Sequence, residues 1–258
     1  MNNPVIIGKA TIYNCDCMEM LKEIKSESID SIITDPPYGT TACKWDSVIP
    51  FDKMWEQLNR IIKPNGAIVL FGQEPFSSYL RMSNINNYKY DLVWKKSKCG
   101  SPFTAKYKPL TKHENILIFE KKGKKTVYNP QMVQGKPYSR ISKVGKDNNM
   151  GFGAKENFRY GSEDGLRHPD CILDFPQKWR RQDQIHPTQK PLELMEYLIK
   201  SYTDEGDIIL DFTMGSGTTG VACVNTNRKF IGVELDKEYY EASIKRIQQA
   251  TAQERLFA

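Results

Sequence analysis

The chain has 258 residues, of which 39% are hydrophobic and 26% charged, and its formal net charge is +6. This length suits one sizeable domain with room for an insert, and the composition argues against wholesale disorder. The apolar runs are far shorter than the roughly 20 residues that span a bilayer, and the first residues lack the pattern of a signal peptide. Six cysteines in a chain of this length are no disulfide framework, so we expect a cytoplasmic protein with reduced thiols.

The first 120 residues alternate strand and helix patterns, which is typical of a mostly parallel sheet with helices on both faces. The run Lys63-Pro64-Asn65-Gly66 should end a helix, because it combines two strong helix breakers. In chain order we expect a strand at Ala10–Tyr13, a helix at about Met18–Ile24, a strand at Ile29–Thr34, a helix at Asp52–Ile62, a strand at Ala67–Phe71, a helix that starts within Pro75–Met82, and strands at Tyr90–Trp94 and Asn115–Phe119.

This alternation stops after residue 120 and returns after residue 185. Residues 121–185 are rich in Gly, Asn and Lys and show no long helical period, so we interpret them as an irregular insert rather than a second autonomous domain. The predicted organisation is therefore one α/β domain formed by residues 1–120 and 186–258, with the insert between them. In the second part we expect a helix at Pro191–Tyr202, a strand at Ile208–Phe212, a helix at Thr218–Asn225, a strand at Phe230–Glu234 and a helix at Glu238–Ala250.

The positive charge is concentrated in the middle of the chain. Residues 89–185 contain 21 Lys and Arg against 10 Asp and Glu, a net charge of +11, whereas the other 161 residues have a net charge of −5. A basic segment within an acidic scaffold favours a polyanionic partner such as nucleic acid, although a solvated lysine-rich surface would give the same count.

A glycine-rich loop follows one predicted strand and opens a helix. Gly215, Gly217 and Gly220 fit the spacing G-x-G-x-x-G, in which glycines permit a tight turn and a close approach of ligand to backbone N–H groups. Glu234 ends the next strand, where an acid can accept from a ribose hydroxyl. This pattern indicates a cofactor that contains a nucleoside. The loop alone does not decide between a dinucleotide such as NAD and S-adenosylmethionine.

The turn Asp35-Pro36-Pro37-Tyr38 decides between them. It follows a predicted strand, at the edge where ligands bind in open α/β sheets. Because prolines donate no backbone hydrogen bond, the turn offers two acceptors, the Asp35 carboxylate and the Pro36 carbonyl. Two rigid acceptors suit an exocyclic NH₂ group, and Tyr38 offers an aromatic face to a planar base. Accepting both amino hydrogens frees the nitrogen lone pair for attack on a methyl group.

With these motifs the sequence resembles the amino-methylating DNA methyltransferases, which use S-adenosylmethionine. Asp35–Tyr38 matches the catalytic motif of that family, and Asp211–Thr219 matches its cofactor loop. Asn14–Cys17, Lys112–Phe119 and His186–Pro191 match further segments of the family. The catalytic motif precedes the cofactor loop with a recognition region between them, an order that resembles the beta subgroup.

The resemblance implies a Rossmann-like methyltransferase sheet and methyl transfer to the N6 amine of adenine in double-stranded DNA, with the N4 amine of cytosine as the alternative. The target nucleotide would be flipped out of the stack, and no metal is implied. The catalytic residues implied are Asp35, Pro36, Pro37 and Tyr38. The cofactor-binding residues implied are Asp16, Cys17, Asp35, Lys190, Asp211, Phe212, Thr213, Gly215, Ser216, Gly217, Thr218, Thr219, Glu234 and Leu235.

One position departs from the family pattern. The usual cofactor loop reads Asp-Pro-Phe-x-Gly-x-Gly, whereas here Asp211 is followed by Phe212 and Thr213. We expect the backbone contacts from Gly215 and Gly217 to survive this change. The change puts in question the side-chain contact to the methionine end of the cofactor.

DNA recognition is expected in the basic middle of the chain, with phosphate contacts near the Trp94 strand and base contacts from the insert. The candidates are Lys95, Lys96, Lys98, Lys106, Lys108, Arg140, Arg159, Arg167, Arg180 and Arg181. The tail with Gln253, Leu256 and Phe257 resembles the short peptide by which bacterial replication proteins dock on the sliding clamp. The resemblance also implies enzymes of the restriction-modification kind, in which homodimers are common.

Two competing hypotheses belong to other classes. An NAD-dependent oxidoreductase would use the glycine loop but would leave the Asp35–Tyr38 turn and the basic insert unexplained. A DNA-binding module would keep the basic insert and would have lost catalysis through the altered cofactor loop.

Overall fold

The computed structural model describes residues 3–40, 46–100, 104–142, 158–177 and 189–257, and the side chains of Ser142 and of residues 158–160 and 254–257 are left out of that description. The chain forms two compact units. One comprises Met1–Asn129 and Cys171–Ala258, and the other is Pro130–Asp170. Within the described ranges, no helix combines the length and the apolar character needed to cross a membrane.

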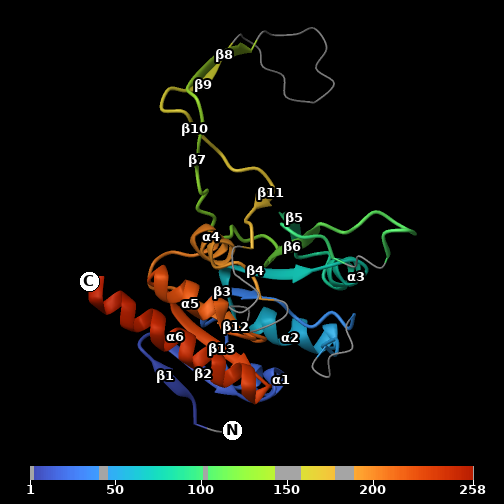
Figure 1. Ribbon diagram of the computed structural model, residues 1–258, viewed down its shortest axis with the longest axis vertical. Coiled ribbons are helices and arrows are strands. Elements are labelled where there is room, and N and C mark those ends of the chain that lie inside the picture. The colour runs from blue at the N-terminus through green and yellow to red at the C-terminus, as the bar shows by residue number, and fades with distance from the viewer. Residues whose placement is uncertain (1–2, 41–45, 101–103, 143–157, 178–188, 258) are drawn as a thin grey trace. The chain divides into compact units, whose positions relative to one another are not determined.

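The larger unit is a nine-stranded sheet with three helices on each face (Figure 1). The strands lie in the order β1-β2-β13-β12-β3-β4-β6-β5-β11. Their bounds are β1 Val5–Ile7, β2 Ala10–Asn14, β3 Ile29–Thr34, β4 Ile62–Gly72, β5 Tyr88–Lys95, β6 His113–Glu120, β11 Ile172–Asp174, β12 Ile208–Asp211 and β13 Lys229–Glu234. Strands β2, β13, β12, β3 and β4 are parallel to their neighbours in this run, whereas β1 and β6 run antiparallel to theirs. This confirms the mostly parallel α/β fold.

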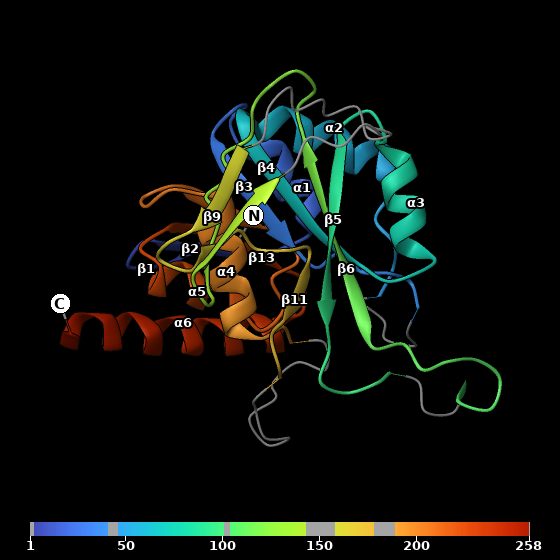
Figure 2. The ribbon, with the colours of Figure 1, turned by 90° about the horizontal axis from the view of Figure 1, so that it is seen from above.

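Alternation along the strands divides the core into two layers, one on each face of the sheet, and Figure 2 shows the sheet with its helices from above. Ile32 and Ile68 face one layer, while their neighbours Ile33 and Val69 face the other. Helices α1, α2 and α3 cover the first layer, and α4, α5 and α6 cover the second. The bounds of the helices are α1 Cys17–Glu23, α2 Phe51–Ile61, α3 Phe76–Ser83, α4 Leu192–Tyr202, α5 Thr218–Asn225 and α6 Lys237–Phe257.

The strand order reverses between β12 and β3. From β12 the chain moves outward through α5 to β13, and from β3 it moves in the opposite direction through α2 to β4. Loops therefore diverge at the carboxyl ends of β12 and β3, which is where open α/β sheets place their ligands. Asp35 follows β3 and Asp211 ends β12, so this point brings together two segments separated by most of the chain.

Most predicted elements agree with the structure to within a few residues, but the breaker run does not form a loop. Residues 63–66 are the first part of β4, which starts directly after α2. At Gly66 the backbone of β3 approaches so closely that a Cβ atom would lie 2.5 Å from the Asp30 carbonyl oxygen. The glycine is therefore required by strand contact rather than by a turn. The structure also adds β1, which no sequence pattern predicted, and extends the last helix to Phe257.

The smaller unit contains two short antiparallel pairs. Strand β7 (Val133–Gln134) pairs with β10 (Leu166–Arg167), and β8 (Tyr138–Ser142) pairs with β9 (Phe158–Ser162). Strand β11 follows this unit and pairs with β5 in the main sheet. The compact unit is thus shorter than residues 121–185, and the boundaries of a recognition insert stay a prediction.

Candidate active site

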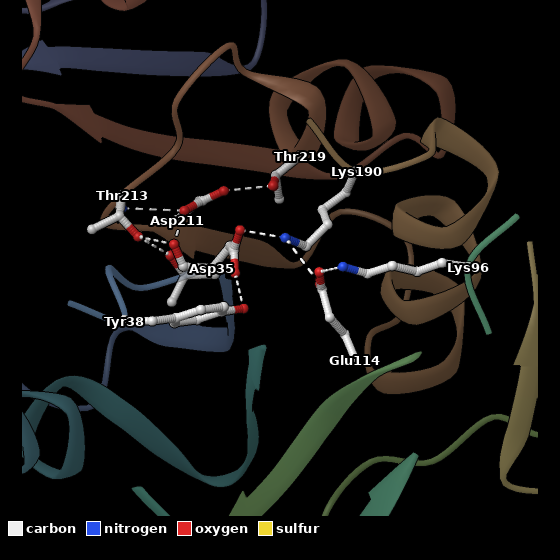
Figure 3. A network of polar contacts seen from close by, with 9 residues as sticks. Asp35, Tyr38, Lys96, Glu114, Lys190, Asp211, Thr213 and Thr219 are labelled. Carbon is white, nitrogen blue, oxygen red and sulfur yellow. Dashed lines mark hydrogen bonds and ion pairs between the residues drawn. The ribbon is translucent and has the colours of Figure 1, made fainter. Parts of the chain in front are cut away.

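Asp35 lies at the centre of a polar network at the carboxyl end of β3 (Figure 3). Its carboxylate accepts hydrogen bonds from the Tyr38 hydroxyl and from Lys190 Nζ. The Asp35 side chain keeps 22% of its surface exposed, whereas the Lys190 side chain keeps 7%. Burial raises the pKa of Asp35, and the Lys190 charge opposes that rise. The pKa of Tyr38 is raised well above its ordinary value by burial and then by Asp35, so the phenol stays a donor.

Lys190 also faces a second carboxylate. Its Nζ lies 3.3 Å from Glu114 Oε2, and the other oxygen of Glu114 pairs with Lys96 Nζ. Asp35, Lys190, Glu114 and Lys96 therefore form a row of alternating charges that runs from the turn after β3 to the end of β5. The paired cations hold the pKa of Glu114 below its ordinary value against the effect of its burial.

Asp211 forms a second polar cluster with three threonines (Figure 3). Its carboxylate accepts from Thr34 Oγ1 at 2.6 Å, from Thr219 Oγ1 at 2.5 Å and from the Thr213 backbone N–H at 3.2 Å. The Asp211 residue is only 3% exposed, and burial raises its pKa to about 6 despite these hydrogen bonds.

Thr213 connects the two clusters. Its hydroxyl donates to the backbone carbonyl of Asp35 at 3.1 Å and lies 2.7 Å from Thr34 Oγ1. The residue that departs from the family pattern thus joins the cofactor loop to the Asp35 turn, while Phe212 is buried in the core. A phenylalanine at position 213 could not form these hydrogen bonds.

The glycine loop is held in shape from both sides. Gly215 and Gly217 have φ values of 51° and 74°, a region that favours glycine. Both carboxylate oxygens of Glu234 accept from backbone, one from Gly215 N and one from Asp236 N, each at 2.8 Å. From α6, Arg246 donates to the Ser216 carbonyl at 2.6 Å and to Thr218 Oγ1 at 3.1 Å. The loop is therefore preorganised by its own contacts.

The Asp35 turn, Lys190 and the glycine loop line one cavity of about 400 Å³, a size in the usual range for small-molecule sites. Five carboxylates and one lysine are among its described lining residues, and that lysine is Lys190, which pairs with two carboxylates. Such an acidic lining suits a cationic ligand better than a polyanionic one such as a pyrophosphate. This favours a sulfonium cofactor over a dinucleotide. The carboxylates are Asp16, Asp35, Asp46, Asp211 and Glu234.

The structure brings together all the predicted catalytic residues and most of the predicted cofactor residues. Asp16 lines the cavity, and it also caps α1 by accepting from the Met18 N–H at 2.7 Å. Cys17 lines the cavity as a neutral thiol, because burial raises its pKa to about 12. Gly217 lies outside the residues that line the cavity and instead is the N-cap residue of α5. The remaining predicted residues that line the cavity are Pro36, Pro37, Tyr38, Lys190, Phe212, Thr213, Gly215, Ser216, Thr218, Thr219 and Leu235.

The predicted DNA contacts lie in several environments. Lys98, Lys106 and Lys108 are exposed, Lys95 is exposed and pairs with Asp174 at 2.7 Å, and Lys96 is half-buried against Glu114. In the smaller unit, Arg140 and Arg167 are exposed and lie 6.0 and 5.3 Å from the centre of the Tyr138 ring. The side chain of Arg159, the residues Arg180 and Arg181, and the side chains of Leu256 and Phe257 lie outside the described part; Gln253 is exposed.

Sequence reasoning missed four residues of this site. Glu114 lies within a quoted family segment but received no role, and Thr34 was read only as the end of a strand. Asp46 accepts from the Gly39 and Thr40 backbone N–H groups at 2.8 and 2.9 Å, and so fixes the backbone after Tyr38. Arg246 lies 30 residues from the loop that it contacts. No local pattern marks Asp46 or Arg246. Glu114, in contrast, is a charged residue directly before a predicted buried strand, and this signal could have identified it.

Comparisons with known proteins agree with this geometry. A family model described as DNA methylase, of the N6/N4 type, matches residues 29–245. The Type II methyltransferase M.HpaI of Haemophilus parainfluenzae is 31% identical over 90% of this chain and 72% of its own length. The DNA adenine methyltransferase YhdJ of Escherichia coli (strain K12) is 28% identical over 93% of this chain and 83% of its own. The crystal structure of the M1.HpyAVI–SAM complex is 30% identical, with a TM-score of 0.62 over 92% of this chain and 99% of that one. With its acceptor turn, its glycine loop and an acidic cavity between them, the chain belongs to the N6/N4 DNA methylase family, whose members use S-adenosylmethionine.

Proposed function

We propose that this protein transfers the methyl group of S-adenosylmethionine to the N6 amine of adenine in double-stranded DNA. The observation that carries the proposal is the hydrogen bond from Thr213 to the Asp35 carbonyl, because it fixes the acceptor turn against the cofactor loop at one cavity. The name of the Escherichia coli relative favours adenine over cytosine as the target. The order of the two motifs along the chain supports placement in the beta subgroup.

The acceptor turn supplies the catalytic chemistry. Asp35 and the Pro36 carbonyl accept from the two amino hydrogens, and Tyr38 stacks on the flipped base. These acceptors favour a tetrahedral nitrogen, so they stabilise the transition state more than the planar ground state. Pro37 stiffens the turn, and Asp35 is the nearest acceptor for the proton that the methylated amine must lose.

The rest of the cavity is suited to the cofactor, which supplies an electrophilic methyl group on a cationic sulfur. The acidic lining would match its sulfonium charge, and the segments around Cys17 and Leu235 would hold its adenosine. Glu234 is placed next to the glycine loop and can accept from a ribose hydroxyl with the lone pairs that its backbone contacts leave. Thr213 and Asp211 face the Asp35 side of the same cavity.

DNA would bind through the exposed lysines that follow β5 and through the arginines of the smaller unit. Phosphate contacts position the duplex, and base contacts from Arg140 and Arg167 select the sequence. We further propose a cytoplasmic enzyme that forms a homodimer and docks on the sliding clamp through its last residues. Deletion of residues 253–258 would remove clamp affinity, and an intact protein without measurable affinity would refute that part.

The test is a methyl-transfer assay with radiolabelled cofactor on mixed-sequence duplex DNA, followed by mass spectrometry of the nucleosides. We expect N6-methyladenine as the labelled product. N4-methylcytosine would replace the adenine assignment with its alternative. An absence of label with the intact protein, together with measurable DNA binding, would support the non-catalytic DNA-binding module instead.

A further inference from the structure

We propose that Glu114 is a positioning residue, which shares Lys190 with Asp35 and thereby keeps Asp35 basic enough to take the proton released by the methylated amine. The proposal rests on the methyltransferase function proposed above. It gives a role to a carboxylate for which the sequence analysis proposed none, and it explains why a lysine in the catalytic cavity faces two acids rather than one.

Glu114 and Lys190 are both buried, and Glu114, which is not among the residues that line the cavity, is joined to the site through Lys190. Lys190 lines the cavity, its side chain is 7% exposed, and its Nζ lies 4.9 Å from the centre of the Phe71 ring. The Glu114 side chain is 9% exposed, and its Oε2 faces the Lys190 ammonium at 3.3 Å. An ammonium so deeply buried requires anionic partners, so Lys190 is fixed by the two carboxylates that it separates.

Lys96 completes the arrangement on the far side. It pairs with the other oxygen of Glu114 and keeps 20% of its side chain exposed, so it links the buried row to solvent. Each inner charge therefore has an opposite charge on both sides. If Glu114 lost its charge, the Lys190 cation would act on Asp35 alone.

Several groups face Asp35 from the elements packed around it. Lys190, ahead of α4, favours the ionised carboxylate, and so does the hydroxyl of Tyr38 from the same turn. Glu114 on β6 is a like charge that raises the pKa of Asp35, and Asp211 at the end of β12 is a second like charge nearby. Asp46 and Lys96 act at longer range, through Tyr38 and Glu114. Glu114 thus offsets part of the effect of Lys190.

The opposing effects of Lys190 and Glu114 on Asp35 matter for the chemical step. The amine lone pair forms the new N–C bond while the C–S bond breaks and its electron pair returns to sulfur, which becomes neutral. The nitrogen now carries the positive charge and two hydrogens. One proton passes to the Asp35 carboxylate and from there to water. A carboxylate stabilised too strongly by Lys190 would be a poorer acceptor for that proton.

The decisive measurement is the titration of Asp35 in cofactor-free protein, by ¹³C-carboxyl NMR, with the resonance assigned through its loss in Asp35→Asn. In Glu114→Gln the titration midpoint should fall by about one pH unit. In Lys190→Met it should rise, because two buried carboxylates then lack their cation. Lys96→Met, at a partly exposed position, should raise the Asp35 midpoint as well. Without Lys96, the negative charge of Glu114 is compensated by Lys190 alone, so less of the Lys190 charge stabilises the ionised form of Asp35.

Glu120→Gln on the same strand is the matched control, because Glu120 is likewise an ion-paired carboxylate but its partners are Lys89 and Thr126. It should leave the midpoint unchanged. In single-turnover assays the acid limb of the pH–rate profile should follow the same shifts, and Glu114→Gln should lower the plateau rate about tenfold. An Asp35 midpoint that stays constant or rises in Glu114→Gln would overturn the proposal, and Lys96→Met decides it if Glu114→Gln does not fold. Because the titration needs no methyl transfer, an inactive wild type would refute the proposed function separately.

Discussion

The ionised form of Asp211 should destabilise the folded state, and a substitution at this position should show the effect. Its ionised carboxylate is 3% exposed with a pKa of about 6, against 3.8 for an ordinary aspartate. That difference corresponds to about 3 kcal/mol, because each pKa unit is about 1.4 kcal/mol. The native state binds this proton more tightly than the unfolded chain. The stability that depends on Asp211 is therefore full below about pH 4 and is lost as the pH rises towards 6.

Hydrogen-bond counting supports the same conclusion. Thr34 and Thr213 have one hydroxyl proton each, yet three contacts join Asp211, these two hydroxyls and the Asp35 carbonyl. A neutral Asp211 supplies the missing third proton, whereas an ionised one leaves a contact without a donor. An amide at position 211 can donate to Thr34 and accept from Thr219 in the same places.

We therefore predict that Asp211→Asn is more stable than wild type at pH 7.5. The gain of about 3 kcal/mol is reduced by about 1 kcal/mol, because the Thr213 N–H loses its acceptor, which leaves about 2 kcal/mol. The assay is urea unfolding followed by tryptophan fluorescence, for both proteins, at several pH values from 4.5 to 8. The difference between the proteins should shrink as the pH falls. A difference that does not vary with pH, or a variant that is less stable at pH 7.5, would refute the reasoning.

Three further predictions test separate parts of the structure. Thr213→Val should lower the turnover rate about tenfold by loss of the contact with the Asp35 carbonyl, whereas Thr213→Ser should keep it; equal rates in both would contradict the role of the hydroxyl. Gly217→Ala should lower the free energy of unfolding by about 1–3 kcal/mol in urea titrations, because φ is 74° and its Cβ would lie 2.7 Å from that of Ser243; a variant as stable as wild type would contradict this. Lys98→Ala and Lys106→Ala should each reduce the slope of log Kd against log salt by about one, and unchanged slopes would exclude phosphate contacts there.

The fold was largely predictable because its signals are local. Buried strands such as Ile29–Thr34 and amphipathic helices such as Leu192–Tyr202 carry their patterns in consecutive residues. The run after Ile61 was misleading, since the reason for Gly66 lies in the neighbouring strand β3 and not in its own segment. Strand β1 has only three residues, too few to show a period.

The candidate site was predictable where chemistry follows a short motif, and not where it depends on long-range pairing. The Asp35 turn and the glycine loop were read directly, but Lys190 lies 155 residues from Asp35, and its partner could not be read from spacing. Lys96 shows the same limit. The neighbouring lysines in the sequence suggest that Lys96 contacts phosphate. In the structure it pairs instead with the buried Glu114 of the adjacent strand β6.

The most direct test is a single-turnover measurement on Asp35→Ala with adenine-containing duplex DNA, together with calorimetric binding of S-adenosylmethionine to the same variant. Asp35 accepts from two side chains and lies at the end of its strand, so its removal should leave the cofactor loop intact. We predict that wild type forms N6-methyladenine, and that the variant forms none while it binds the cofactor with an affinity within about tenfold of wild type. Methylation at the wild-type rate by Asp35→Ala would contradict the proposed mechanism.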